Sequence, residues 1–188
     1  AAPGGGGLTA RRTACRRGAR LAPLAAMAVA GPAAADAAAE RADRALALFA
    51  RACLDEGPGF AGSVAAFEAA GLTRPGGTPF HRSADGVIEA LAAPAGTLPG
   101  TPAGTCSVFA QGSGFAPAED RVAALLANHL PAAPARHDAP DTTAGGIEPE
   151  ESVVFTWAGD GVAAQVVLVR DADRALGLSL VMAPEAGE

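Results

Sequence analysis

The stretch that decides the fold is residues 152–182, SVVFTWAGDGVAAQVVLVRDADRALGLSLVM. It contains three runs rich in β-branched and large apolar residues, 152–157, 162–170 and 175–182, and short turn sequences separate them. Runs of this composition predict strands. Consecutive strands with short turns pair as an antiparallel meander, and one face of such a sheet must be covered by other elements.

Two other segments have the periodicity of amphipathic helices, which could cover that face. Residues 38–54 carry an apolar stripe that consists of Ala42, Leu46, Phe49, Ala50 and Cys53. Residues 117–130 begin with a proline and two nearby acids, as helices often do. Their apolar stripe consists of Val122, Leu125, Leu126, His129 and Leu130. We expect these segments to be the two main helices.

A shorter helix is expected over residues 63–70. Ser63 is suited to the N-cap, and Gly71 is suited to the left-handed position that follows a last helical turn. Leu72 would then fold back onto the helix, as in a Schellman ending. The residues expected in the core here are Phe60, Val64 and Phe67.

The predicted fold class is α+β. Two short strands near 80–91, turning at Asp85-Gly86, and a strand near 105–111 join the C-terminal meander in an antiparallel sheet. We expect about four to six strands, packed against the two main helices. Residues 131–150 contain four prolines and no periodicity, which predicts a long, flexible, exposed loop.

The N-terminal 37 residues have the pattern of a secretory signal peptide. Residues 11–20 hold five arginines and no acid, residues 21–30 are apolar, and residues 33–37 offer small side chains for cleavage. The apolar run is too short to span a membrane, which takes about 20 residues. We expect Sec-type export of one domain, residues 38–188, to the periplasm or outside. Twin-arginine export or a disordered basic arm remains an alternative.

Cleavage after Ala37 would change the charge of the chain. The full sequence has 14 arginines, no lysine and 20 acids. Removal of five arginines and Asp36 leaves 9 arginines and 19 acids, a net charge of −10. A domain this acidic is repelled by phosphate backbones, so nucleic-acid binding is disfavoured. The bias towards Ala, Gly, Pro and Arg is typical of a GC-rich bacterial genome.

Two of the three cysteines, Cys53 and Cys106, lie beyond the expected cleavage site. An even cysteine count in an exported protein favours a disulfide. Cys53 lies on the core stripe of its helix, and Cys106 lies in the strand sequence GTCSVF, residues 104–109. A bond between them would close a long loop and stabilise the domain by about 4 kcal/mol.

One alternative for Cys106 is a thiolate nucleophile with a histidine base, and another is a free or metal-bound thiol. The candidates for that base are His81, on a predicted strand, His129, on a helix stripe, and His137, in the proline-rich segment. Cys106 lacks the glycine-rich turn that often presents a nucleophile, and a satisfied core or helix-end role suits His129 better. We expect no catalytic residue, apart from this alternative.

Neither a metal site nor a cofactor motif is predicted. His137, Asp138 and Asp141 lie among prolines without the spacing of metal ligands, and Asp171 and Asp173 lack the Gly and Glu of a calcium loop. The protein is therefore expected to be a small, acidic, exported bacterial domain that binds an unknown protein or small ligand. One version is an inhibitor of a basic enzyme, with 131–150 as its contact loop. The alternative is a Cys/His thiol hydrolase that uses Cys106 with His81.

Overall fold

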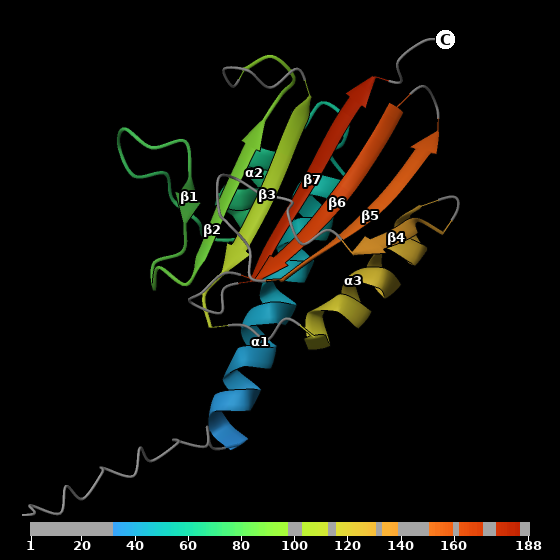
Figure 1. Cartoon of the computed structure of the whole chain (residues 1–188). Helices are drawn as coiled ribbons and strands as arrows, with labels where there is room; N and C mark the ends of the chain where they lie inside the picture. Colours follow the sequence, from blue (N-terminus) through green and yellow to red (C-terminus); the bar gives the residue numbers. More distant parts are fainter. Residues whose placement is uncertain are drawn as a thin grey trace, which may run out of the picture.

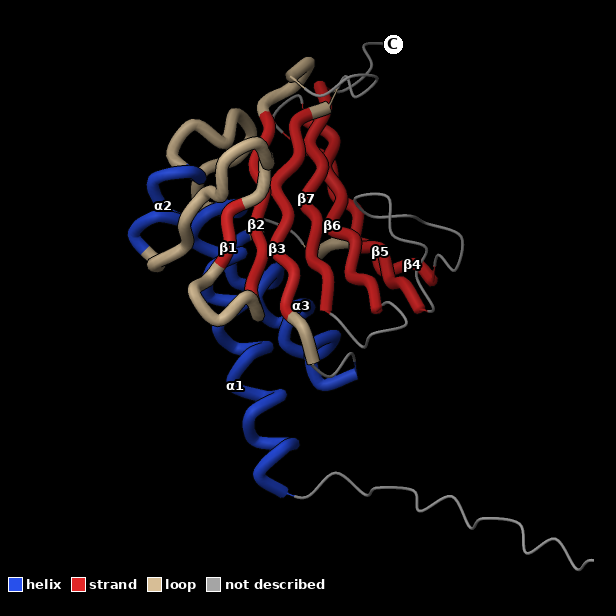
Figure 2. Tube along the Cα trace, turned by 90° about the vertical axis from the view of Figure 1, so that its left-hand side faces the viewer, coloured by secondary structure: helices blue, strands red, loops and turns tan. Residues whose placement is uncertain are grey.

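The computed structural model describes seven ranges (Figure 1): 32–97, 103–112, 116–130, 133–138, 151–159, 162–170 and 176–184. Within these ranges, seven strands form one sheet and three α-helices lie on one side of it. Figure 2 shows the strands one beside another from β1 to β4, with α2 to their left and α1 and α3 below. The described chain is therefore an α+β fold.

The sheet is antiparallel throughout, in the order β1-β2-β3-β7-β6-β5-β4. Its strands are β1 (His81–Arg82), β2 (Ile88–Ala93), β3 (Gly104–Ala110), β4 (Ala135–Asp138), β5 (Glu151–Gly159), β6 (Val162–Arg170) and β7 (Leu176–Pro184). Strands β1 to β3 form one meander, β4 to β7 form another, and the two meet where β3 pairs with β7. The predicted α+β class, C-terminal meander and strands near 80–91 and 105–111 are confirmed.

The helices are α1 (Pro32–Phe49), α2 (Ser63–Ala69) and α3 (Ala116–His129), and a π-helical turn, η1 (Ala50–Leu54), continues α1. Helix α3 matches the expected 117–130, and α1 with η1 contains the expected 38–54. The first helix begins earlier than expected, because proline is favoured in the first turn and an alanine run has high helix propensity.

The first residues of α1 contribute little to the core. Residues 33–36 are exposed, and Ala42 is the first buried residue. Figure 1 shows this part of α1 extending beyond the end of the sheet. The predicted leader up to residue 31 lies outside the described residues, whereas the candidate cleavage positions 33–37 lie in this exposed part of the helix.

The prediction of a loop throughout 131–150 was wrong for β4. This strand has no apolar alternation, but its backbone pairs with β5, opposite Val153 to Thr156. Arg136 reinforces it by forming ion pairs with Glu119 of α3 at 2.7 Å and with Asp138 at 2.8 Å. Backbone pairing at a sheet edge does not require buried side chains, so the sequence showed no period for it. Residues 139–150 lie outside the described residues.

The ending of α2 follows the prediction, whereas its beginning does not. Gly71 has φ of +82°, and the Leu72 N–H donates to the Phe67 carbonyl at 3.0 Å, which is the Schellman bond. Ser63 is not the N-cap, because the cap position is Gly62 and the Ser63 side chain is buried. Val64 is 41% exposed, so its expected place in the core was also wrong.

The core lies between the helices and the sheet. Alternate residues of the strands face it, among them Phe155, Val166, Leu178 and Val108, and the apolar stripes of α1 and α3 pack on them. The opposite face of the central strands is also buried. A second apolar cluster of valines lies there, and the hydroxyl groups of Ser107 and Ser179 are 2.9 Å apart. The sheet centre therefore tolerates little change in side-chain volume.

Gly177 lies on that opposite face, directly between Phe109 and Val169. A Cβ at Gly177 would lie 2.5 Å from Val169 Cγ2 and 3.1 Å from the Phe109 ring. We therefore expect Gly177→Ala to lower the free energy of unfolding by about 1–3 kcal/mol through overpacking. Urea titration followed by circular dichroism measures this change.

The matched control is Gly159→Ala at the end of β5, where a Cβ meets nothing within 4 Å. Its unfolding free energy should stay within about 0.5 kcal/mol of the unmodified chain. Equal losses for the two variants would contradict the steric account.

Candidate functional site

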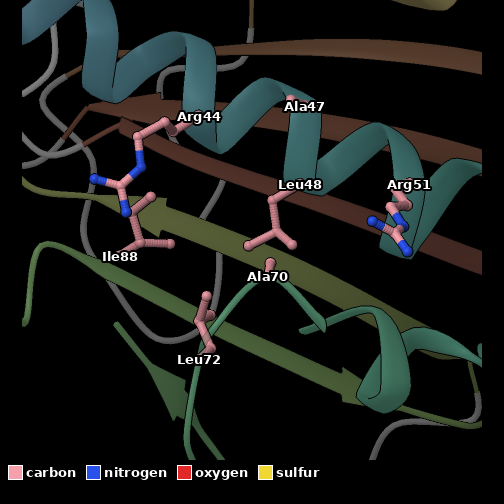
Figure 3. A pocket seen from close by; sticks show the side chains of 7 residues that line it. All are labelled: Arg44, Ala47, Leu48, Arg51, Ala70, Leu72 and Ile88. Carbon is pink, nitrogen blue, oxygen red and sulfur yellow. The ribbon is translucent and has the colours of Figure 1, made fainter. Parts of the chain in front are cut away.

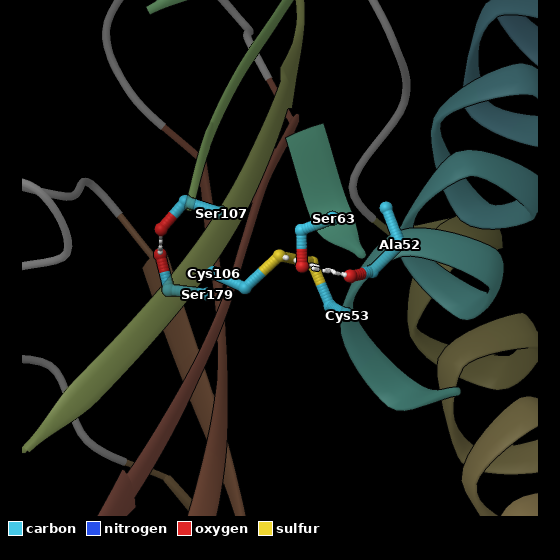
Figure 4. The surroundings of a disulfide bond; sticks show 6 residues. All are labelled: Ala52, Cys53, Ser63, Cys106, Ser107 and Ser179. Atoms are coloured by element: carbon cyan, nitrogen blue, oxygen red, sulfur yellow. Dashed lines mark hydrogen bonds between the residues drawn. A yellow bond between two sulfur atoms is a disulfide. The ribbon is translucent and has the colours of Figure 1, made fainter. Parts of the chain in front are cut away.

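Cys53 and Cys106 lie at disulfide distance in the middle of the fold (Figure 4). Their Sγ atoms are 1.99 Å apart, and both residues are completely buried. Cys53 comes from η1, and Cys106 comes from β3, which pairs with β2 and β7. The pair therefore joins the helical layer to the centre of the sheet, as the cysteine pattern predicts.

A buried hydroxyl supports the helical side of this junction. Asp55 N–H donates to the Ala50 carbonyl, the five-residue spacing of a π-turn. The Ala52 carbonyl accepts a hydrogen bond of 2.5 Å from the Ser63 hydroxyl of α2. Ser63 therefore joins α2 to η1 beside Cys53 instead of capping its own helix. The sequence showed no sign of the π-turn, so this partner for Ser63 could not be predicted.

The structure does not bring His81 to Cys106. His81 pairs with Ala90, Ala90 pairs with Val108, and Cys106 lies two residues farther along β3. Two strand spacings of about 4.8 Å and an offset of about 6.8 Å place the two Cα atoms about 12 Å apart, beyond hydrogen-bond reach. His81 therefore cannot serve as a base for Cys106.

His81 occupies an unusual environment of its own. It is 3% exposed, and neither ring nitrogen has a hydrogen-bond partner among the described residues. Its ring lies against Phe67, with centroids 5.4 Å apart. Burial lowers the pKa of His81, Arg74 lowers the pKa further, and Glu68 raises it. A neutral imidazole is the form that this environment favours.

The other two candidate histidines are accounted for by local contacts. His129 Nδ1 lies 2.8 Å from the Leu125 carbonyl, and its Nε2 lies 3.6 Å from Asp55, so it is a satisfied helix-end residue. His137 is exposed on β4, where its Nε2 lies 3.2 Å from the Thr156 hydroxyl. Among the described residues, no group of three or more His, Cys, Asp or Glu is arranged to hold a metal ion.

A groove runs between α1 and the segment from α2 to β2 (Figure 3). Its volume is about 240 Å³, and its lining residues are Arg44, Ala47, Leu48, Arg51, Ala70, Leu72 and Ile88. Arg44, Ala47 and Leu48 of α1 recur with Arg51 of η1 at helical spacing and so share one face. Leu48, Leu72 and Ile88 form an apolar floor, and Figure 3 shows Arg44 and Arg51 near opposite ends of the wall formed by α1 and η1. The sequence shows no sign of this groove, because its walls meet only in the folded chain.

The two arginines of the groove differ in their surroundings. Arg44 lies 3.6 Å from Asp85 in the β1–β2 turn. The Ser83 hydroxyl and the Val87 N–H donate to Asp85 and lower the pKa of its carboxyl. Asp85 is therefore a carboxylate that partly neutralises Arg44. Arg51 is exposed and has no hydrogen bond or ion pair with any described residue.

Comparison with known proteins gave no match among family models, curated proteins or solved structures. Within the described ranges, none of the helices combines the length and the apolar character needed to cross a membrane.

Loss of the disulfide should strongly destabilise the fold. The bond closes a loop between residues 53 apart, which corresponds to about 4 kcal/mol in the chain-entropy treatment. We expect the double substitution Cys53→Ala with Cys106→Ala to lower the free energy of unfolding by about that amount in urea titrations. Adding reductant should destabilise the unmodified chain and leave the double variant unaffected. Equal stability of the two oxidised proteins would contradict a structural role.

Burial of neutral His81 should make stability depend on pH. Because its folded pKa is lowered, the unfolded chain takes up the proton first as the pH falls below about 6.5. The contribution of His81 to stability is therefore complete above pH 6.5 and is lost as the pH falls towards the folded pKa. We expect His81→Leu, which removes both unpaired nitrogens, to flatten this dependence in urea titrations between about pH 7.5 and pH 5.

The matched control is His137→Leu on exposed β4, which should keep the pH dependence of the unmodified chain. If His81→Leu lost stability as steeply as the unmodified chain on acidification, His81 would not be the group responsible.

Proposed function

We propose that this protein is an exported, non-enzymatic binding domain of the bacterial cell envelope, made as a precursor that loses residues 1–37. The observation that carries the proposal is the buried Cys53–Cys106 pair. A disulfide is compatible with an oxidising compartment, and it occupies the thiol that a Cys/His hydrolase would need.

Two features of the described chain support export. The candidate cleavage positions lie in the first turns of α1, exposed at 33–36 and half-buried at Ala37, ahead of the first buried residue, Ala42. Cleavage after Ala37 would therefore remove no core side chain. It would also remove Cys15 and leave two cysteines, Cys53 and Cys106, which form the bond with each other.

The groove beside α1 supports a binding role. It combines an apolar floor with an exposed arginine that has no described partner. Binding sites are typically concave and apolar with few polar groups that set orientation. No specific observation favours the thiol hydrolase, because Cys106 lies at disulfide distance from Cys53 and His81 is out of its reach.

Export can be tested by expressing the full chain in a Gram-negative host and fractionating the cells. We expect the periplasmic protein to begin near Ala38, and we expect no titratable thiol without reductant. Intact mass measured before and after reduction should differ by the two hydrogens of one disulfide. The matched control replaces the five arginines of residues 11–20 with glutamates, because positive charge in this region promotes export.

The control precursor should remain in the cytosol, uncleaved and with free thiols. If the unmodified chain also remained there at full length with free thiols, export would be wrong. Thiol-dependent hydrolysis by the purified protein would overturn the non-enzymatic assignment.

A further inference from the structure

Arg51 is distinctive among the arginines whose side chains the structure describes. The others whose side chains are described each make a hydrogen bond or an ion pair: Arg41, Arg44, Arg74, Arg82, Arg121 and Arg136. Carboxylates outnumber arginines in the sequence, so partners are abundant. Arg51 nevertheless lies beside the groove without one, and none of the described lining residues is acidic. The guanidinium is therefore available to an external anion.

The charge of the groove suits one negative group better than two. Arg44, which is partly neutralised by Asp85, lies seven residues from Arg51, about 10.5 Å along the helix. A single compact anion could therefore be held by Arg51 alone. A carboxylate matches the planar guanidinium, because two parallel hydrogen bonds can form between them.

The remainder of the groove suits an unbranched apolar chain. Leu48, Leu72 and Ile88 are core residues, at most 6% exposed, whose aliphatic side chains close the bottom of the groove. Ala47 and Ala70 are exposed, and their small side chains leave the space above this floor open. The volume of about 240 Å³ corresponds to about eight groups the size of a water molecule or a methylene.

We infer that the groove binds a free alkyl carboxylate of about eight carbons, with its carboxylate on Arg51 and its chain over Leu48, Leu72 and Ile88. This inference rests on the proposed binding function and specifies its ligand. Burial of the alkyl chain of the ligand supplies most of the affinity, and the guanidinium of Arg51 selects a ligand with negative charge.

The test is titration of the isotope-labelled chain, with its disulfide intact, by sodium octanoate while backbone amide shifts are recorded. We expect saturable shifts at Ala47, Leu48 and Leu72, with Kd on the order of 1 mM or tighter. Octyltrimethylammonium has the same chain with the opposite charge, and acetate has the same charge without the chain. Both should bind at least about tenfold more weakly, because a charged hydrogen bond or several buried methylenes would be lost.

Two variants probe the two parts of the groove. Arg51→Gln should weaken octanoate binding about tenfold or more by removing the charged partner. Ala47→Glu should abolish binding, because an exposed helix position accepts Glu easily while its carboxylate enters the groove. The matched control is Arg136→Gln on β4, which removes one positive charge at the far edge of the sheet and should leave binding unchanged.

The outcomes separate this inference from the proposed function. Unchanged octanoate binding in Arg51→Gln, or equal binding of octyltrimethylammonium, would overturn the carboxylate assignment. Shifts at the groove with an acidic, leucine-containing peptide but not with octanoate would overturn the ligand class and keep the binding domain. If the protein were exported with its disulfide formed, but no ligand shifted the amide signals of the groove, the groove would not be the binding site. If export failed, only the proposed location would be overturned.

Discussion

The pairing of β3 with β7 is the contact on which the rest of the structure depends. It joins the β1–β3 meander to the β4–β7 meander, so it is a junction between strands far apart in sequence. It also makes β3 a central strand, which places Cys106 beneath the helical layer. Non-local pairing is entropically costly to form. The disulfide beside that junction therefore lowers the entropic cost of the pairing that is most costly to form.

Composition explains why such a link suits this protein. Many apolar residues of the chain are alanines, and an alanine buries little area compared with leucine or phenylalanine. Large side chains such as Phe49, Phe67 and Leu178 are already completely buried. The disulfide restricts the unfolded chain without requiring further core volume. The Ser63 hydrogen bond to the Ala52 carbonyl and the close contacts around Gly177 likewise hold the structure together without large side chains.

Local patterns predicted most of the fold. The alternation in 152–182 was sufficient for the meander, and the helical stripes placed Leu46, Phe49 and Cys53 in the core. Features that depend on backbone pairing or distant partners escaped prediction. Strand β4 shows no apolar periodicity, because all four of its residues are exposed. Ser63 does not cap α2, because its hydroxyl donates to the Ala52 carbonyl in the π-helical turn, which the sequence does not predict. The groove could not be predicted, because Arg51 and Leu72 are brought together only by the tertiary fold.

The position of the groove connects stability with binding. One wall continues from α1 into η1, which carries both Arg51 and Cys53, and the opposite wall includes the Schellman ending of α2. Both walls are therefore held by strong local constraints, and a preorganised site loses less entropy on binding. In an acidic chain, the long-range field repels anions, so only a short-range contact can overcome it. An unpaired guanidinium at the rim of an apolar groove provides that contact, and it selects anions that also carry an apolar chain.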